Sequence, residues 1–403
     1  MEYGASIGQR VARARRQRGL SQPALAERMG VTAGYISKVE RGAVILDRIS
    51  AIAAFADALG VELPYMLGQP QMLIQSPDAE VMGIPAIEAA LMPTSLFVSF
   101  APTDRVEDYD VSVLGEEAEA IWAAYQDGEY ATMGERLPSL IARCQAAHTA
   151  AGVGSKAKTA AVLTMVYCAT KSLLVQVGEL KLAHLALERA IGAADQADDP
   201  LLRPLVLWHL AAVLLAQGRT ADALHVAEAE VNRLHDETGR ARPELLSLYG
   251  GLALKGVVAA ARLEKGLQTW SLWAEAEVQA RRLGRDRNDY MTLFGPTNCQ
   301  MIATTAGVDL SQPEVALRHH AKIKPGAMSS PGRESRHLVT VARAQCKLGQ
   351  DTPALKTLLA AEQLAPEQLR YKPMATEVVR ELRRRHRPGR LEELAARIGA
   401  DDT

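Results

Sequence analysis

The sequence predicts an all-α protein in which a five-helix bundle precedes a curved array of helical repeats. Hydrophobic residues make up 48% of the 403 residues and aromatic residues only 4%, and Ala and Leu carry most of the apolar share. Both residues favour helices over strands. Apolar residues recur at helical spacing, and glycines separate one apolar helix from the next. Because the chain exceeds one comfortable core, we expect a small head and a larger body.

Charge is distributed unevenly along the chain. The formal net charge is −1 at pH 7, which excludes a polycation that coats nucleic acid indiscriminately. Residues 1–70 nevertheless carry more Lys and Arg than Asp and Glu, and the rest of the chain carries the compensating acid. Positive charge concentrated in a small head indicates a polyanionic partner there.

Several classes of protein are disfavoured by what the sequence lacks. The 4 cysteines form no C-x-x-C pair, so we expect reduced thiols in a cytoplasmic protein. His319-His320 is a lone pair without further ligands at metal-binding spacing, and we expect no metal. Neither an apolar leader nor an uninterrupted 18-residue apolar run is found, which argues against secretion and membrane insertion. Nucleotide-binding, zinc-protease and serine-hydrolase motifs are missing, so we expect neither catalysis nor a cofactor.

The head begins with three short helices, predicted over residues 7–18, 21–29 and 32–41. Ser21 and Thr32 are suitable N-caps for the second and third helix, and a glycine follows each of the three. Two short helices joined by a short, glycine-containing turn form a helix-turn-helix. Apolar residues downstream would complete the bundle: Ile49, Ile52, Phe55, Leu59, Leu63 and Leu67.

The third helix has a buried face and an outward face. Ile36 and Val39 are spaced for burial. The residues that face outward together are Ala33, Gly34, Ser37, Lys38 and Arg41. Only small side chains lie at the N-terminal end of this face, which is the end that a recognition helix inserts into the major groove.

Five stretches of the head carry a family resemblance: Gly19-Leu20-Ser21-Gln22, Leu25-Ala26, Gly30-Val31-Thr32, residues 35–42 and Ala58-Leu59-Gly60-Val61. Together they resemble the XRE helix-turn-helix family of phage repressor and Cro proteins. The resemblance implies that Arg15 pairs with Glu40, and that Gln22 binds a phosphate and braces the third helix. It also implies which residues contact double-stranded DNA: Gln22, Thr32, Ala33, Gly34, Tyr35, Ser37, Lys38 and Arg41.

Ala33 and Gly34 depart from the long polar residues that phage repressors often have at these positions. Neither can form bidentate hydrogen bonds to bases, so readout would depend on Ser37, Lys38, a contact of Ala33 with a thymine methyl group, and DNA shape. A glycine inside a helix suggests that the backbone approaches DNA closely. The alternative is a bundle used for protein contact, with its arginines merely solvated.

Prolines separate the head from the body. We assign residues 1–69 to the DNA-binding head, 70–112 to a linker with one short helix at about residues 86–91, and 113–403 to the body. No long helix can cross the linker. Its prolines are Pro70, Pro77, Pro85, Pro93 and Pro102.

The body is predicted to consist of helical hairpins. Glycines that end one apolar helix and begin the next recur at steps longer than the tetratricopeptide period of about 34 residues. They are Gly128, Gly178, Gly218, Gly266, Gly307 and Gly349. In three cases a small residue follows five positions later and would let the second helix pack closely on the first: Ala183, Ala223 and Ala354.

The body resembles tetratricopeptide-like repeats with extended helices, five or six hairpins that end in a cap near residues 391–398. Such an array forms a curved solenoid whose concave face can hold a peptide or another ligand. XRE heads joined to such bodies occur in peptide-sensing quorum regulators and in actinobacterial regulators, and the motif over residues 294–298 is more similar to the second group. The resemblance implies a homodimer whose body senses an effector.

Few residues of the body stand out as contacts for an effector, a peptide or a small molecule. The candidates are Tyr167, Trp208, Tyr249, Tyr290 and Asn298. For the aromatic residues core packing is the alternative, and for Asn298 it is a tight interhelical turn beginning at Gly295-Pro296. Arginines are concentrated over residues 380–390, where a solvated terminal helix, a second phosphate contact and an acidic partner are the alternatives.

These features predict a cytoplasmic, sequence-specific transcription regulator that binds DNA as a homodimer and responds to an effector in its body. The alternative is a protein-interaction scaffold whose body binds a protein partner and whose head only localises it on DNA. A repressor without any ligand is a third interpretation.

Overall fold

The computed structural model describes residues 6–61, 63–67, 83–92, 110–127, 129–240, 242–324, 326–328, 331–366, 369, 373–385 and 389–400. The regular elements within these residues are helices, and the only β-type pairing among them is an isolated bridge between Arg287 and Phe294. The predicted all-α fold class is confirmed.

Five helices form the head. They are α1 (Ile7–Gln17), α2 (Gln22–Met29), α3 (Ala33–Glu40), α4 (Ile49–Leu59) and α5 (Leu63–Met66). Their apolar faces share one core, and each of the six downstream residues predicted to complete the bundle is buried in it. Burying apolar side chains from all five helices in one place stabilises the bundle, because each short helix would be marginal alone.

The helices of the body continue along the chain in antiparallel pairs. They are α9 (Val111–Asp127), α10 (Tyr130–Ala150), α11 (Val153–Gln176), α12 (Leu180–Ala194), α13 (Leu202–Ala216), α14 (Thr220–Leu234), α15 (Pro243–Arg262), α16 (Gly266–Leu283), α17 (Pro296–Asp309), α18 (Pro313–His320), α19 (Pro331–Lys347), α20 (Asp351–Leu364), α22 (Pro373–Arg385) and α23 (Gly389–Ile398), with the 3-10 helices η1 (His235–Arg240) and η2 (Asp289–Met291). The predicted linker contributes α7 (Ile84–Leu91), which packs against α10 and α12. The linker prolines Pro70, Pro77, Pro93 and Pro102 lie outside the described residues.

One turn geometry recurs in five hairpins, from α11–α12 to α19–α20. A residue with a left-handed backbone lies two positions before the second helix of each: Gly178, Gly218, Glu264, Ser311 and Gly349. Five positions after it a small residue is fully buried: Ala183, Ala223, Thr269, Ala316 and Ala354. A small side chain there lets the two helices of a hairpin approach closely, as the sequence predicted for three of the five.

Three of the predicted glycine turns differ from the structure or lie outside it. Gly307 lies inside α17 and not at a turn, and a Cβ there would lie 2.8 Å from the main-chain nitrogen of Ala316 in α18. It is therefore a point of close helix contact. At the α15–α16 turn the left-handed residue is Glu264, and Gly266 is the first residue of α16. Gly128 lies outside the described residues.

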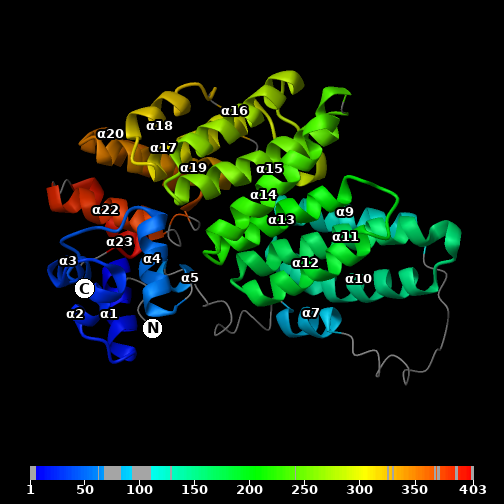
Figure 1. Ribbon diagram of the computed structural model, residues 1–403, viewed down its shortest axis with the longest axis horizontal. Coiled ribbons are helices and arrows are strands. Elements are labelled where there is room, and N and C mark those ends of the chain that lie inside the picture. The colour runs from blue at the N-terminus through cyan, green and yellow to red at the C-terminus, as the bar shows by residue number, and fades with distance from the viewer. Residues whose placement is uncertain are drawn as a thin grey trace.

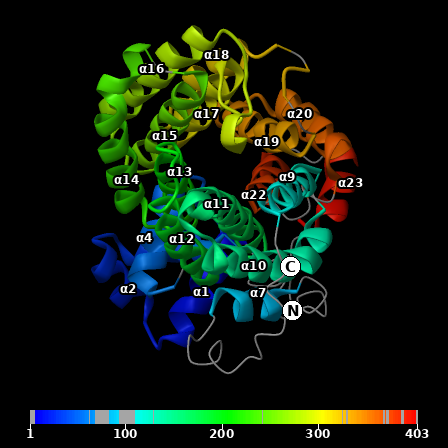
Figure 2. The same ribbon diagram turned by 90° about the vertical axis from the view of Figure 1, so that its right-hand side faces the viewer.

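The hairpins stack into a curved array with two layers. The first helices α11, α13, α15, α17 and α19 pack on one another in succession. In Figure 2 the helices α13, α15, α17 and α19 line the inside of the curve, while α14, α16, α18 and α20 lie outside. The inner layer therefore presents one continuous surface built from consecutive repeats, as in other solenoids.

The head is docked on the body. Figure 1 shows the blue head helices beside the red C-terminal helix α22. Asp47, in the loop before α4, forms an ion pair with Lys347 at 2.6 Å, and Arg48 forms one with Glu264 at 2.9 Å. The main-chain nitrogen of Ile7 donates a hydrogen bond to Glu377 of α22 at 3.2 Å. Three separate elements of the body therefore hold the head in place.

The arginine-rich C-terminal segment is only partly solvated: the side chains of Arg384 and Arg385 are 42% and 37% exposed, whereas two other arginines are buried. Arg380 and Arg383 are buried, and they form ion pairs with Glu377 and Glu392 at 3.3 Å and 2.8 Å. The prediction of a solvated terminal helix is wrong for these side chains. His386 and Arg387 of the same run lie outside the described residues. The helix that follows, α23, buries its apolar face against α22 as the predicted cap.

Two helices of the array, α11 and α15, are long and apolar enough to span a bilayer by length and composition alone. Within the molecule 72% and 83% of their apolar windows are buried. Their hydropathy is explained by their position, because both belong to the inner layer and pack against helices on several sides.

Candidate functional site

The turn before α3 is built by capping residues. Gly30 adopts a left-handed backbone (φ 65°) at the end of α2, and the side chain of Thr32 accepts a hydrogen bond from the main-chain nitrogen of Tyr35 at 3.2 Å. Ser21 caps α2 in the same way. These caps satisfy main-chain donors that a helix start leaves unpaired, so they set the direction in which α3 leaves the turn.

Helix α3 is fixed against the head core by its apolar face. Ile36 and Val39 are fully buried, and Tyr35 stacks on Phe55 with ring centroids 6.3 Å apart. A Cβ at Gly8 of α1 would collide with the main-chain oxygen of Val39, so only glycine permits this approach of α1 to α3.

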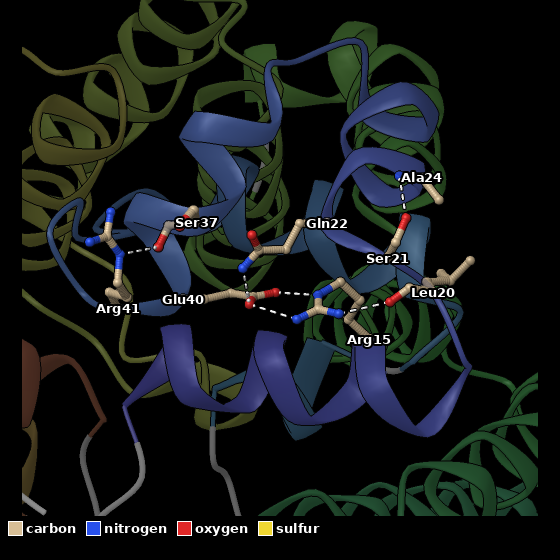
Figure 3. Close-up of polar contacts among 8 residues, drawn as sticks. All are labelled: Arg15, Leu20, Ser21, Gln22, Ala24, Ser37, Glu40 and Arg41. Atoms are coloured by element: carbon tan, nitrogen blue, oxygen red, sulfur yellow. Dashed lines mark hydrogen bonds and ion pairs between the residues drawn. The ribbon is translucent and has the colours of Figure 1, made fainter.

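A buried ion pair holds α1, α2 and α3 together (Figure 3). Arg15 donates from Nε and Nη2 to the two carboxylate oxygens of Glu40, at 2.5 Å and 2.8 Å, and from Nη1 to the main-chain oxygen of Leu20 at 2.7 Å. Gln22 Nε2 donates to Glu40 at 2.8 Å. The predicted contact between Arg15 and Glu40 is present, and the amide of Gln22 braces α3 through Glu40.

The ionisation of Glu40 follows from this network. Burial alone would raise the pKa of the Glu40 carboxyl, but the hydrogen bonds from Arg15 and Gln22 and the charge of Arg15 lower the pKa below its usual value. The carboxylate therefore remains charged and bound to Arg15 at neutral pH, which keeps the position of α3 rigid.

The opposite face of α3 is open to solvent. Thr32, Gly34, Lys38 and Arg41 are exposed, and a Cβ at Gly34 would meet nothing closer than the Thr32 hydroxyl at 3.9 Å. Ala33, Tyr35 and Ser37 are partly exposed. The residues predicted to face DNA therefore lie along one slim edge, with small side chains at its start and cations toward its end.

The body adds a further cation next to this edge. A Cβ at Gly42, directly after α3, would lie 3.1 Å from the Nη2 atom of Arg384 in α22. The Arg384 side chain is 42% exposed. Arg41 and Arg384 therefore extend the basic rim of α3 from the head to the C-terminal helix, a contact that the sequence alone did not locate.

The predicted effector residues fall into two groups. Trp208 of α13 and Asn298 of α17 come from the inner layer, where Lys255 Nζ lies 4.6 Å from the Trp208 ring centroid and Arg333 donates to the Asn298 side chain. Both polar partners were missed at the sequence level. A lysine in the middle of a long apolar helix, as in α15, is the signal that could have indicated Lys255.

Among the described residues, no hydrogen bond or ring contact joins the three predicted tyrosines to Trp208 or Asn298, although Tyr167 and Tyr249 belong to the core on which Trp208 packs. Tyr167 is buried and its hydroxyl accepts from Gln145 of α10 at 2.9 Å. Tyr249 is fully buried, with its hydroxyl 3.1 Å from His235 and 3.2 Å from Glu275. Tyr290 donates to Asp199 at 2.9 Å from η2. Each hydroxyl is engaged within the protein, in keeping with the alternative of core packing.

The Gly295-Pro296 turn starts α17 as expected. Phe294 is fully buried against Gly250, where a Cβ would collide with the phenyl ring. The main-chain nitrogen of Thr297 donates to Asp286 at 3.0 Å. This anchoring holds the first turn of α17, and with it Asn298, in a fixed position on the inner layer.

The paired histidines have separate neighbours. His319 contacts Gln300 at 2.7 Å and lies against Trp270 and Trp273, whereas His320 contacts His337 at 3.0 Å. Among the residues that the structure describes, no group of three His, Cys, Asp or Glu side chains is placed to bind a metal ion.

Comparison with known proteins agrees with the geometry of the head. Residues 6–64 match the family of helix-turn-helix domains. The sequence matches none of the curated proteins. Among solved structures the chain is similar to a crystal structure of Bacillus thuringiensis PlcR in complex with the peptide PapR7 and DNA, with 13% identity and a TM-score of 0.26, over 91% of this chain and 97% of that chain. The head is a helix-turn-helix domain, as the sequence predicted.

Proposed function

We propose that the chain is an XRE-type, sequence-specific DNA-binding regulator of transcription. The single observation that carries this proposal is the exposed edge of α3, with small residues at its N-terminal end and Lys38 and Arg41 toward its C-terminal end. A helix of this shape fits the major groove, and basic side chains at its margin reach phosphates. Residues 1–69 serve as the DNA-binding domain, 70–112 as the linker and 113–403 as the sensing domain.

Each exposed residue of α3 has a role in this proposal. Ser37 and Lys38 read base edges, and Ala33 contacts a thymine methyl group. Gly34 allows the backbone to approach the DNA. Thr32 faces base edges together with these residues, and the residues that hold phosphates are Gln22, Tyr35 and Arg41. Gln22 keeps one amide hydrogen for a phosphate, because only one is needed for its contact with Glu40.

The regulator acts as a homodimer on two half-sites. Paired recognition helices read half-sites about 34 Å apart, or a multiple of this, which is one or more turns of B-form DNA. It works in the cytoplasm, associated with the nucleoid when bound to DNA, and uses no cofactor. Light scattering of the full chain, alone and with a duplex that contains two half-sites, tests whether the protein is a dimer.

A peptide or small-molecule effector in the body controls DNA binding. Two helices of the inner layer support this proposal. Each carries a basic residue beside a predicted effector residue, and each leads at its C-terminal end to a residue that forms an ion pair with the head. Helix α15 bears Lys255 and leads into Glu264, which pairs with Arg48. Helix α19 begins near Arg333 and ends at Lys347, which pairs with Asp47. A ligand that favours one arrangement of these helices would shift the head, provided its affinity differs between the two states.

The alternative function is a scaffold whose body binds a protein partner on DNA. The continuous surface of the inner layer also suits a protein segment. Selection of duplexes from a random pool by the full chain, followed by sequencing, tests the regulator. We expect an enriched motif with two related halves. If the recovered duplexes show no enriched motif at any salt concentration, the result would favour the scaffold.

A further inference from the structure

The inner layer holds a cluster of basic side chains that comes from consecutive repeats. Lys171 of α11, His209 of α13 and Lys255 of α15 belong to three first helices that pack in succession. Lys171 Nζ lies 3.0 Å from His209 Nδ1, and Lys255 Nζ lies 4.6 Å from the ring centroid of Trp208, the neighbour of His209. Arg333 of α19 extends the cluster, since its charge acts on Lys255.

The two lysines of this cluster lack a counter-charge among the residues that the structure describes. Within the described residues, neither Lys171 nor Lys255 forms an ion pair, and the charges that act on them are chiefly those of other cations. Lys171 is only 6% exposed. A buried ammonium is costly unless it is paired, and burial lowers the pKa of Lys171 to about 7 and that of Lys255 to about 8. The Trp208 ring and His209 Nδ1 are the groups described beside these two amines, and an anion would stabilise their charged form further.

His209 adds a second unsatisfied group. The ring is buried, and its Nε2 atom has no hydrogen-bond partner within the described residues. When Lys171 is charged it can only donate, so Nδ1 accepts and the proton of the neutral ring lies on Nε2. A buried N–H without an acceptor is rare in folded proteins, because leaving it unmade costs free energy.

The cluster is reachable from the inner layer. Lys255 and Trp208 are partly exposed, whereas Lys171 and His209 lie deeper. Gly251, one turn before Lys255, leaves space for the indole, because a Cβ there would lie 3.1 Å from Trp208 Nε1. The partly exposed Lys255 and Trp208 therefore lie between the surface of the inner layer and the buried Lys171 and His209.

We propose that Lys171, Lys255 and His209, with Trp208 beside them, form a recognition site for an anionic group, a carboxylate or a phosphate, of the effector. The inference rests on the proposed function insofar as the ligand is the effector of the regulator. The anion supplies the missing counter-charge of both amines. Its oxygen atoms also provide an acceptor for the Nε2 proton of His209. Because α15 leads directly to Glu264 and the head, occupation of this site is placed to change the contact with Arg48.

Two uncharged variants and one control test the site in the full-length protein. In Lys171→Met and Lys255→Met an amine of the cluster is replaced by an apolar side chain of similar length, and in Lys158→Met an exposed lysine on α11 is replaced. Replacing a buried charge by an apolar group is often neutral or stabilising, so both variants should fold. We expect the thermal midpoint of Lys171→Met to equal or exceed that of the unaltered protein.

The probes are inorganic phosphate and citrate, titrated against chloride at equal ionic strength and followed by calorimetry and tryptophan fluorescence. We expect saturable binding of one probe or both, weakened about tenfold or more in the two cluster variants and unchanged in Lys158→Met. Preference for phosphate or for citrate distinguishes a phosphorylated from a carboxylated ligand. Absence of saturable binding, or equal binding by the cluster variants, would overturn the proposal.

DNA binding is measured separately, so that the two proposals can fail independently. Without added anion, Lys171→Met and Lys255→Met should bind the selected duplex as the unaltered protein does, because neither residue lies in the head. Anion binding without any DNA binding would contradict the proposed function alone. DNA binding without anion binding would contradict this inference alone.

Discussion

Arg343 in the body donates a hydrogen bond to the main-chain oxygen of Asp47 in the head. The same guanidinium lies 3.9 Å from the carboxylate of Asp309, and both side chains are buried. One arginine of α19 thus joins the last turn of α17 to the loop that follows α3. The inner layer and the head are therefore in direct contact through this residue.

Replacing Arg343 by Met should be costly. The variant removes the guanidinium beside buried Asp309, so that Arg262 is the arginine whose charge still acts on this carboxyl, and it frees the Asp47 carbonyl. We therefore expect a loss of about 3 kcal/mol in the free energy of unfolding. Lys347→Met is the control, because it removes an ion pair of which Asp47 is 41% exposed, and such pairs contribute about 0–1 kcal/mol. Urea denaturation followed by circular dichroism measures both. Equal losses would contradict the role of Arg343 in joining α17 to the head.

The pair of Arg15 and Glu40 predicts how the head responds to acid. Because the pKa of Glu40 is lowered in the folded state, the pair stabilises the head fully above the usual carboxyl pKa near 4.5 and loses this effect as pH falls through the lowered pKa. Glu40→Gln should cost about 1–3 kcal/mol at pH 7, and the difference from the unaltered protein should shrink below pH 4.5.

Denaturation of the unaltered protein and of Glu40→Gln at several pH values measures this effect, with amide exchange in α1 and α3 reporting on the head. Glu27→Gln, on the exposed side of α2, is the matched control and should have little effect. A difference that stays constant from pH 7 to pH 3 would show that the charge of Glu40 is irrelevant to stability.

Gly307→Ala tests the close contact of α17 with α18. The added Cβ would lie 2.8 Å from the main-chain nitrogen of Ala316, so we expect a loss of about 1–3 kcal/mol from overpacking. Gly266→Ala is the control, since a Cβ at that position meets nothing within 4 Å. Thermal denaturation compares the two. An unchanged midpoint in Gly307→Ala would contradict the helix contact described here.

Much of the fold follows from local sequence signals. Gly178, Gly218 and Gly349 were recognised as turns, because glycine is the residue that adopts a left-handed backbone most easily. Glu264 and Ser311 adopt the same conformation with φ of 59° in equivalent turns, and nothing in their residue type indicates it. Tertiary packing of the hairpin imposes the turn there, so a search for glycines misses it.

The candidate sites were predictable to different degrees. Capping residues and apolar spacing placed α3 and its exposed edge, because these signals are local. The partners of Trp208 and Asn298 come from other repeats, 47 residues after Trp208 for Lys255 and 35 residues after Asn298 for Arg333. Contacts across repeats depend on the curvature of the array, which no local pattern encodes. The burial of Arg380 and Arg383 was missed because it follows from the packing of α22 against α19, α20 and α23, which the charge pattern of one helix does not indicate.

Gly34→Ala should separate stability from DNA binding. Alanine at an exposed helical position should stabilise α3 by about 0.5–1 kcal/mol, and the added methyl group meets open space. If the α3 backbone approaches DNA, the same methyl group should weaken binding to the selected duplex. Thermal denaturation and fluorescence anisotropy measure the two effects. Unchanged affinity would show that the groove does not reach the backbone at Gly34.

The affinity of Lys38→Ala for the selected duplex, measured by anisotropy across a salt series, tests the central claim most directly. Lys38 is exposed on α3, and Lys158→Ala, an exposed lysine of the body, is the control. We predict a loss of about 1–3 kcal/mol in binding if Lys38 reads a base, or a salt slope smaller by about one if it holds a phosphate. Affinity and salt slope equal to those of Lys158→Ala would contradict the assignment of α3 as the recognition helix.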